Sequence, residues 1–346
     1  MQQGMRAVMP APYKVMYETF ALPAPEPDQI VITTEASAIS AGTELAVYTG
    51  IHQWLNDPTR TWPRFPFVPG YSAVGRITAL GEQVRDWAVG DRVIWPGRHE
   101  SHAVVRIDEA ARIWRIAEHV PASVAACALL TRFPLTAVVR SGEVLGQSMA
   151  VLGLGLIGQL ALRLFSAAGA YPLIGLDPVA RRRELATSTQ GVVALDPFTD
   201  DLQASLRAAN GGALLDIVVD ATGLPDAVKS AMSIVVDGGR VVMVGSPRGI
   251  AQQVDFYWDL HGRSISLIGA HGSAIGSAAR ERFPFTQDRA LRLIAHLLES
   301  GKLRIDDLLT HEVDGRELHA VYEGLLHDRD TFVGVTVHWT TAEAGA

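Results

Sequence analysis

Three glycines lie at a spacing that can hold a pyrophosphate group. Gly153, Gly155 and Gly158 form a G-x-G-x-x-G pattern directly after the apolar run at 149–152. The first glycine permits a tight turn, the second lets a pyrophosphate approach the backbone, and the third lets a helix pack closely on the strand. Apolar residues recur at helical spacing over 159–169, so a helix should begin at the third glycine with the phosphate at its N-terminus. We therefore predict a dinucleotide-binding site at this turn.

An acidic residue closes the next apolar run. Residues 172–176 read as a second strand, and Asp177 follows at roughly the 20-residue separation expected of a ribose-binding carboxylate. A carboxylate there accepts hydrogen bonds from both ribose hydroxyls and repels a 2′-phosphate, which favours NAD over NADP. Arg181, Arg182 and Arg183 come next. They indicate either a solvated helix face with Arg182 beside the adenine ribose, or a site for the phosphate of NADP.

The composition is that of a globular protein with room for two domains. The chain has 346 residues, of which 48% are hydrophobic and 19% charged. Its net charge of −7 disfavours nucleic acid and anionic membranes as partners, because both attract basic surfaces. One cysteine, Cys127, can form neither an internal disulfide nor a cysteine-cluster zinc site, so we expect a reducing, cytoplasmic location. We expect no secretory signal and no membrane-spanning segment.

Residues 5–125 form a β-rich pattern that is broken by frequent glycines. Short runs such as 73–80 and 92–95 lie between turns, which predicts a Greek-key barrel or a similar compact β domain. One stretch, 50–69, departs from this pattern because it combines His52 with tryptophans, phenylalanines and prolines. It can pack its aromatic side chains on the barrel or line a substrate pocket, and the sequence leaves both interpretations open.

From residue 122 onward, apolar strands alternate with helices, which predicts a doubly wound parallel sheet. After the glycine turn, strands are expected at 172–176, 192–195, 214–219, 240–244 and 264–268. Ligands of such sheets bind beyond the carboxyl ends of the strands, where many of the candidate residues fall. The predicted cofactor-binding residues are Gly153, Gly155, Leu156, Ile157, Gly158, Asp177, Arg182, Ala221, Thr222, Gly223, Val244, Gly245, Ser246, Gly269 and His271.

The tail of the chain begins near residue 273. It contains amphipathic helices at 289–301 and 318–326 and an alternating strand at 332–339. A lone strand needs a sheet to pair with, so we place the tail on the β domain. Residues 50–69 and 283–288 are the segments expected to shape a substrate pocket.

Several short motifs together resemble those of the medium-chain dehydrogenase/reductase superfamily, and the resemblance covers nearly the whole chain. They are Gly42-Thr43-Glu44 with Tyr48 and Gly50, Val68-Pro69-Gly70-Tyr71 with Gly75, Val89-Gly90-Asp91-Arg92-Val93, the glycine turn, Asp220-Ala221-Thr222-Gly223 and Gly238-Gly239-Arg240.

The resemblance implies an α/β fold with a GroES-like β-barrel catalytic domain plus a doubly wound Rossmann domain. The catalytic domain would comprise 1–125 and 274–346, and the NAD-binding Rossmann domain would comprise 126–273. A cofactor cleft between the two domains is also implied. The edge strand of the Rossmann domain, 264–268, would pair across a twofold axis and form a homodimer.

The metal-ligand positions of zinc-dependent relatives hold other residues in this chain. Where those relatives carry a cysteine before the Thr-Asp pair and a Gly-His-Glu motif, this chain has Ala41 and Gly70-Tyr71-Ser72, and the third ligand aligns near Thr131. Catalytic zinc takes about three protein ligands. We therefore predict an enzyme of the zinc-independent branch, with no metal ion.

The histidines indicate no replacement metal site. His99 and His102 lie close together in the sequence with Glu100 between them, but no further acid or thiol lies nearby. We interpret both as surface or pocket residues rather than metal ligands.

Without zinc, hydrogen-bond donors must stabilise charge on the oxygen of the reacting alcohol or ketone. The match to the family places Thr43 at the position whose hydroxyl relays a proton in relatives. It places Tyr71 at the position of a metal ligand, so that its phenol would point into the space of the missing metal. Glu44 replaces an aspartate of the family pattern and is catalytic or structural. His52 and His271 are the titratable candidates, because an unperturbed histidine changes charge near neutral pH, and His271 follows the strand at which relatives approach the nicotinamide. These five residues form the predicted catalytic set.

The motifs do not select one substrate. Ser40 to Glu44 and Pro69 to Tyr71 resemble zinc-lacking bacteriochlorophyllide hydroxyethyl dehydrogenases, whereas the tail resembles sugar and cyclitol dehydrogenases. We expect NAD-dependent oxidation of a small-molecule secondary alcohol or reduction of its ketone, with a sugar, cyclitol or natural-product intermediate as substrate. The alternatives are an enone or quinone reductase, a redox-neutral epimerase or lyase with tightly bound NAD, and a nucleotide-sensing protein without catalysis.

Overall fold

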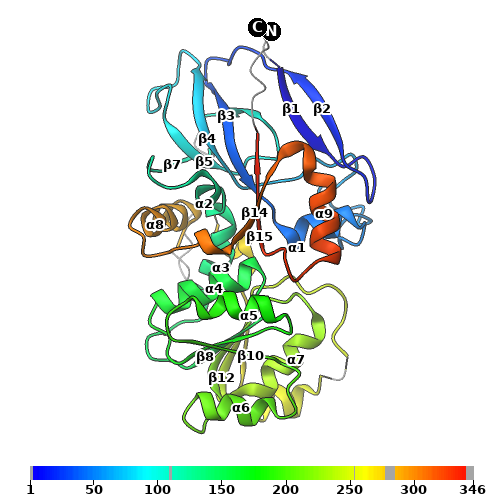
Figure 1. Cartoon of the computed structure of the whole chain (residues 1–346), viewed down its shortest axis with the longest axis vertical. Helices are drawn as coiled ribbons and strands as arrows, with labels where there is room; N and C mark the ends of the chain where they lie inside the picture. The colour runs from blue at the N-terminus through cyan, green and yellow to red at the C-terminus, as the bar shows by residue number, and fades with distance from the viewer. Residues whose placement is uncertain (1–2, 109–110, 253, 277–284, 340–346) are drawn as a thin grey trace. The chain divides into compact units, whose positions relative to one another are not determined.

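The computed structural model describes residues 3–108, 111–252, 254–276 and 285–339, and the chain forms two compact units (Figure 1). Unit 1 comprises residues 1–130, 286–301 and 309–346, and unit 2 comprises residues 131–285 and 302–308. The sequence pattern had suggested 125 and 273 as the boundaries. Segment 283–288, expected near the substrate, lies partly outside the described residues.

The short segment 302–308 belongs to unit 2 because an ion pair holds it there. Arg163, a nearly buried residue of helix α4 (Leu156–Ala167), contacts Asp307 through both guanidinium nitrogens, at 2.6 and 2.7 Å. Ser188 also donates a hydrogen bond to Asp307 at 2.7 Å. A bidentate arginine–carboxylate pair has a defined geometry, so it can tie a short segment to a helix.

Among the described residues, unit 1 contains a seven-stranded sheet in the order β14-β15-β3-β4-β5-β7, with β6 paired to β3, and a separate hairpin of β1 and β2. These strands are β1 (Gln3–Val8), β2 (Met16–Ala21), β3 (Gln29–Ala38), β4 (Ala73–Leu80), β5 (Arg92–Trp95), β6 (His102–Arg106), β7 (Trp114–Arg115), β14 (Leu309–Asp314) and β15 (Gly334–His338). Strand β15 pairs antiparallel with β3, with Thr336 opposite Ala38. The prediction that the last strand joins the β domain is therefore confirmed.

The helices of unit 1 are α1 (Ala41–Tyr48), α2 (Ala122–Ala126), α8 (Gln287–Glu299) and α9 (Leu318–His327), with a 3-10 turn at Gly315–Glu317. Helix α9, drawn in orange-red, lies beside the blue helix α1 in Figure 1, and the two are in contact. Tyr48 and Tyr322 stack at this contact, with ring centroids 5.1 Å apart. Both rings belong to a core cluster that also includes Val335 and Val337 of β15, so the tail completes the hydrophobic core of unit 1.

Unit 2 has the predicted parallel sheet. Its strands are β8 (Met149–Leu152), β9 (Leu173–Leu176), β10 (Val192–Leu195), β11 (Leu215–Asp220), β12 (Val235–Met243) and β13 (Ser266–Gly269). All described pairings in it are parallel, in the order β10-β9-β8-β11-β12-β13. Counted along the chain this is the order 3-2-1-4-5-6 of a dinucleotide-binding fold. The doubly wound sheet is therefore confirmed.

Helices connect these strands and cover the sheet. Besides α4 they are α3 (Ala128–Arg140), α5 (Ala180–Thr187), α6 (Leu202–Ala209) and α7 (Pro225–Ile234), with a π-helix at Phe256–His261 and 3-10 turns at Gly272–Ala274 and Asp306–Leu308. The last strand was expected from residue 264, but it begins at 266. Ser264 has a φ of 52°, which is incompatible with a regular strand. No helix of the described residues is long and apolar enough to cross a membrane.

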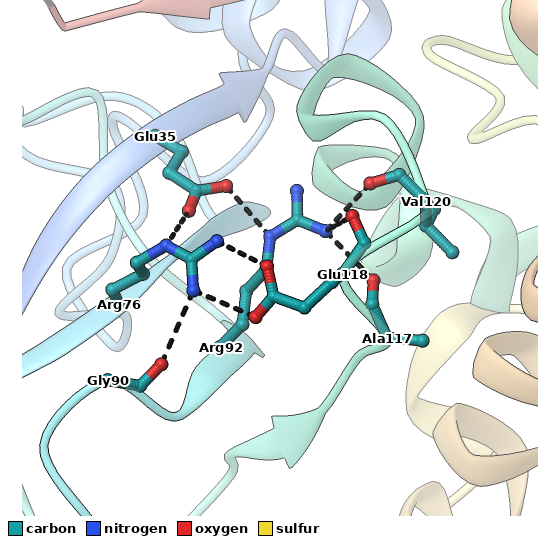
Figure 2. Close-up of polar contacts among 7 residues, drawn as sticks. All are labelled: Glu35, Arg76, Gly90, Arg92, Ala117, Glu118 and Val120. Carbon is teal, nitrogen blue, oxygen red and sulfur yellow. Dashed lines mark hydrogen bonds and ion pairs between the residues drawn. The ribbon is translucent and has the colours of Figure 1, made fainter.

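Two arginines and a glutamate connect the central strands of unit 1 (Figure 2). Glu35 of β3 contacts Arg76 of β4 and Arg92 of β5, each at 2.8 Å. The almost fully buried guanidinium of Arg92 also donates to the carbonyl oxygens of Ala117 at 2.9 Å and Val120 at 2.7 Å. We call these residues, together with Glu118, the arginine network. It fixes the segment that leads into α2 against the sheet.

Candidate functional site

The glycine turn of unit 2 has the geometry that its spacing predicts. Gly153 has a φ of 84°, in the left-handed region that favours glycine, and a Cβ there would lie 2.8 Å from Cγ2 of Thr222. A Cβ at Gly158 would lie 1.8 Å from the carbonyl oxygen of Gly153, so α4 can approach the turn only without a side chain. Gly155 precedes α4, and a Cβ there would meet no atom within 4 Å among the described residues. The residues at this turn therefore fit a pyrophosphate group, with Leu156 and Ile157 in the first turn of the helix.

Asp177 lies at the end of β9 and is bonded to the same turn. Its Oδ2 accepts a hydrogen bond from the backbone N–H of Leu154 at 2.7 Å, and its Oδ1 accepts from Val179 at 2.8 Å. Arg182 Nη1 lies 3.8 Å from Oδ2. The carboxylate is only 3% exposed, and each of its oxygens retains capacity for a further donor such as a ribose hydroxyl.

The three arginines after Asp177 have different surroundings. Arg183 donates to the carbonyl oxygen of Asp177 and pairs with Asp196, both through Nη1, at 2.8 and 3.0 Å. Arg181 pairs with Glu184 at 3.2 Å. Of the three, Arg182 is therefore the one whose guanidinium approaches the carboxylate of Asp177.

The ends of β8, β11 and β12 meet beside the glycine turn. A side chain at Gly153 would strike Thr222, and a Cβ at Gly245 would lie 2.4 Å from the backbone nitrogen of Gly223. Asp220 Oδ1 accepts hydrogen bonds from the backbone N–H and the hydroxyl of Thr222, at 3.0 and 2.6 Å. Ala221 lies within this same Asp220–Gly223 turn. The structure thus brings together residues that are about 90 positions apart in the chain, as the parallel-sheet prediction required.

Asp220 is fully buried, and its second carboxylate oxygen has no hydrogen-bond partner among the described residues. Burial raises the pKa of Asp220 above its ordinary value, although hydrogen bonds from Thr222 and Gly223 lower it in part. This carboxyl group therefore orders the turn that carries Thr222 and Gly223.

The remaining predicted cofactor residues follow β12 and β13. Val244 and Ser246 flank Gly245, and Gly269 ends β13 opposite Met243 of β12. His271 is exposed and begins the 3-10 turn, where its Nδ1 accepts a hydrogen bond from the backbone N–H of Ser273 at 3.2 Å and lies 2.7 Å from the Ser273 hydroxyl. His271 is therefore a capping residue with an exposed ring.

In unit 1, hydroxyl groups gather at the start of α1. The phenol of Tyr71 donates a hydrogen bond to the hydroxyl of Ser40, the residue before the helix. Thr43 lies three positions later, on the same side of the helix as Ser40. All three side chains are half-buried. Ser40 was not among the predicted residues, although a serine immediately before a helix is the sequence signal that could have drawn attention to it.

Glu44 lies deeper, in a network that the sequence did not predict. Its Oε2 is 2.9 Å from His99 Nε2 and accepts a hydrogen bond from the phenol of Tyr322 at 2.6 Å. Ser37 Oγ lies 2.8 Å from His99 Nδ1. We call Glu44, His99, Tyr322 and Ser37 the histidine network. The interpretation of His99 and His102 as surface or pocket residues was wrong, because the side chain of His99 is 0% exposed and His102 is buried as well.

The charge state of the histidine network follows from these contacts. Burial alone would raise the pKa of Glu44, but the charge and hydrogen bond of His99, with those of Tyr322 and Ser40, hold it below its ordinary value. Burial and the neighbouring carboxylate raise the pKa of Tyr322 well above its ordinary value. Glu44 is therefore an ionised carboxylate that accepts hydrogen bonds, and Tyr322 is a neutral donor.

The loop at 50–69 is folded on its own aromatic side chains. The nearly buried ring of His52 packs edge-on against Trp54 and Trp62, and Trp62 packs on Phe67 of the unit 1 core. The guanidinium of Arg64 donates to several backbone carbonyls of the loop, including that of Trp54 at 2.8 Å. The interpretation that these aromatic residues pack on the β domain is confirmed. His52 is thus part of an aromatic cluster.

The positions that match zinc ligands carry poor ligands. Ala41 has no donor, Tyr71 binds Ser40, and the buried hydroxyl of Ser72 donates to the carbonyl oxygen of Ala126. Thr131 is also buried. Burial raises the pKa of the Cys127 thiol to about 12, so this sulfur is protonated at ordinary pH. Within the described ranges, no three His, Cys, Asp or Glu side chains are grouped as metal ligands would be.

Comparison with known families matches both units. Residues 26–115 match the family described as alcohol dehydrogenase GroES-like domain, and residues 157–288 match the family described as zinc-binding dehydrogenase. The L-threonine 3-dehydrogenase of Thermococcus kodakarensis is 25% identical over 349 residues, which cover 91% of this chain and 93% of the relative. The L-galactonate-5-dehydrogenase of Escherichia coli K12 is 26% identical over 352 residues, which cover 94% and 96%.

A solved structure shows the same fold. The 2R,3R-butanediol dehydrogenase from Bacillus subtilis has a TM-score of 0.81 at 20% identity, over 97% of this chain and 99% of that one. The predicted combination of a GroES-like β domain with a doubly wound Rossmann domain is thereby confirmed.

Proposed function

We propose that the chain is a member of the medium-chain dehydrogenase/reductase superfamily and that it transfers a hydride between NAD(H) and a secondary alcohol or its ketone. The enzyme is a dehydrogenase that acts on alcohol groups. We infer a sugar, cyclitol or natural-product intermediate as substrate, since the named activities of relatives include dehydrogenation of a sugar acid. The observation that carries the proposal is the glycine turn, in which Leu154 donates to Asp177 while Gly155 faces open space.

The dinucleotide is NAD in this proposal. The carboxylate of Asp177 is bonded to the turn, so it would accept the ribose hydroxyls and repel a 2′-phosphate. The guanidinium of Arg182 forms an ion pair with the carboxylate of Asp177 at a distance of 3.8 Å. The test is the ratio of Michaelis constants for NAD and NADP with one alcohol. Preference for NADP by about tenfold or more would overturn the assignment.

We further propose that the reaction needs no zinc. The donor set does not fit this metal, because Ala41, Tyr71 and Ser72 offer neither thiolate, imidazole nor carboxylate. Bound NAD would accept the hydride, and the chain would have to hold the substrate oxygen through neutral hydroxyls such as Thr43 and the hydrogen-bonded pair of Tyr71 and Ser40. Elemental analysis of active enzyme tests this proposal. Zinc in a 1:1 ratio to protein, whose removal abolishes turnover, would exclude it.

The predicted catalytic set is tested by substitution. Loss of one hydrogen-bond donor to a developing oxyanion commonly lowers kcat by about 100-fold or more. We expect Tyr71→Phe to lower kcat by at least about tenfold. His52→Ala and His271→Ala test whether the two imidazole rings take part in catalysis. Turnover within threefold of wild type for all three variants would discard the set.

We propose that the enzyme is a homodimer formed through β13. This strand is at the edge of the sheet, and Leu267 on it is 41% exposed; the π-helix that precedes the strand in the chain also carries the exposed aromatic residues Phe256 and Trp258. An exposed edge with apolar side chains favours pairing with another chain. Light scattering should give twice the chain mass. Leu267→Lys should shift the protein to monomer, and Phe198→Lys, an exposed residue after the opposite edge strand, should leave the mass unchanged.

A further inference from the structure

The first turn of α1 has an unusual cap. A serine before a helix normally uses its hydroxyl to accept a backbone N–H of the first turn, while a nearby glutamate reaches back to the N–H of the serine. Ser40 makes no such side-chain bond to the helix. Only the other half of the arrangement is present, because Glu44 Oε1 accepts the N–H of Ser40 at 2.8 Å. The hydroxyl of Ser40 is therefore left for the phenol of Tyr71, which donates to it.

The carboxylate of Glu44, which takes the place of the serine cap, is itself held by hydrogen bonds to other side chains. One oxygen of Glu44 contacts Ser40, and the other contacts His99 at 2.9 Å and Tyr322 at 2.6 Å. The hydroxyl of Ser37 lies 2.8 Å from Nδ1, the other nitrogen of the His99 ring. These four side chains of the histidine network are buried, whereas Ser40 and Tyr71 are half-buried. The contacts thus run from buried side chains to the half-buried hydroxyl groups of Ser40 and Tyr71.

We propose that His99 is a positioning residue: acting through Glu44, it holds Ser40 so that the Ser40 hydroxyl accepts the Tyr71 phenol and donates its own proton to the substrate oxygen. This proposal rests on the proposed dehydrogenase function. A hydroxyl that accepts one hydrogen bond becomes a stronger donor of the next, because hydrogen bonds in a chain polarise one another. Ser40 would then be the donor that stabilises negative charge on the substrate oxygen, and Tyr71 would act through it.

The first experiment needs neither cofactor nor substrate. Tyrosine labelled with ¹³C at Cζ reports the hydrogen bond of each phenol in the NMR spectrum of the full chain, and Tyr71→Phe identifies the signal of Tyr71. Ser40→Ala should move that signal, because it removes the acceptor. His99→Leu should move it in the same direction. His99→Gln should leave it near the wild-type position, since the glutamine amide can donate to Glu44 as His99 Nε2 does.

The matched control is His102→Leu. His102 is also buried, and its Nδ1 lies 2.9 Å from Ser101 Oγ rather than facing Glu44. Its replacement should leave the Tyr71 signal in place. If His99→Leu does not fold, Tyr322→Phe removes one hydrogen bond to Glu44 at little change in volume, and it should move the signal by a smaller amount. The proposed positioning role of His99 would be overturned by the following result: Ser40→Ala moves the Tyr71 signal, but no folded variant of His99 or Tyr322 does.

The second experiment measures turnover of an alcohol that the wild-type enzyme oxidises. Ser40→Ala and His99→Leu should each lower kcat by about tenfold or more, with an unchanged KM for NAD, and His99→Gln should recover most of the loss. Adding Tyr71→Phe to Ser40→Ala should cost little more, because both act on one hydrogen bond. A Ser40→Ala variant within threefold of wild type would remove Ser40 from catalysis. Failure of the wild type to bind NADH would instead refute the proposed function and leave the NMR result standing.

Discussion

The arginine network and the histidine network of unit 1 differ in charge and burial. In the arginine network, Glu35 contacts Arg76 and Arg92, and the side chain of Arg76 is 42% exposed (Figure 2). In the histidine network, Glu44 contacts His99 and Tyr322, and no member reaches solvent appreciably. Guanidinium groups keep their charge at all ordinary pH values, whereas a histidine and a phenol can change protonation.

This difference shows how the same fold uses ion pairs for two purposes. Arg92 donates to the carbonyl oxygens of Ala117 and Val120, so its network ties a backbone segment to the sheet. Glu44 instead accepts the N–H of Ser40 and thereby sets the hydroxyl groups at the start of α1. The first network is expected to affect stability alone. The second is expected to affect stability and the geometry of the proposed site together.

The largest effect is expected for Glu44→Leu. This change leaves His99, Tyr322 and the N–H of Ser40 buried without their acceptor, and breaking a buried pair in this way costs about 3–5 kcal/mol. Urea unfolding should show this loss in the free energy of unfolding. A loss below about 1 kcal/mol would mean that the interior supplies other partners for these groups.

A smaller loss is expected for Arg92→Leu. Its guanidinium is nearly buried, but Glu35 keeps Arg76 as a partner after the substitution. We expect a loss of about 2–3 kcal/mol, because hydrogen bonds to charged groups contribute on this scale. The same variant should leave the NMR signal of Tyr71 unchanged. Movement of that signal would contradict the separation of the two networks.

The pH dependence of stability should also separate the networks. The pKa of Glu44 lies below its ordinary value of 4.5 in the folded chain, so the ionised carboxylate stabilises the fold above that pH. The contribution is lost as the pH falls through the lowered pKa. Between pH 7 and pH 3, the free energy of unfolding should fall less steeply in Glu44→Gln than in wild type. In the acid part of this range, Arg92→Leu should show the wild-type slope. Equal slopes in Glu44→Gln and wild type would contradict this assignment.

The smallest effect is expected for Arg76→Leu. Its side chain is largely solvated, and exposed ion pairs contribute about 0.2–1 kcal/mol. Added salt should reduce even this contribution, whereas it should leave the cost of Glu44→Leu unchanged, because buried pairs are screened much less. If Arg76→Leu lowered the free energy of unfolding as much as Arg92→Leu, the exposure of a side chain would not determine how much its contacts contribute to stability.

Residues that act locally could be predicted from the sequence. The spacing of Gly153, Gly155 and Gly158 predicts a turn whose geometry depends on a few neighbouring backbone atoms, and the structure has that geometry. Asp177 could be placed because the end of an apolar strand leads directly to the ligand side of a parallel sheet. Such features repeat at fixed short separations, so a pattern in one segment is sufficient to recognise them.

The histidine network could not be predicted in this way. His99 was interpreted as a surface or pocket residue because no acid or thiol beyond the adjacent Glu100 lies near it in the sequence, yet Glu44, 55 positions earlier, accepts its hydrogen bond. Tyr322 comes from a helix 278 positions after Glu44. Their meeting depends on the pairing of β15 with β3, which brings the tail to the first helix.

The sequence alone determined the glycine turn and the alternation of strands and helices, because each is a property of residue type and short spacing. The replacement of the usual zinc ligands followed from the resemblance to the family. Only the tertiary structure decided that Glu44 meets His99 and Tyr322, that His99 lies in the interior, and that Tyr71 binds a serine hydroxyl. Those outcomes depend on contacts between distant segments. Buried polar groups need hydrogen-bond partners, and here those partners come from distant segments, which the order of residues along one segment does not specify.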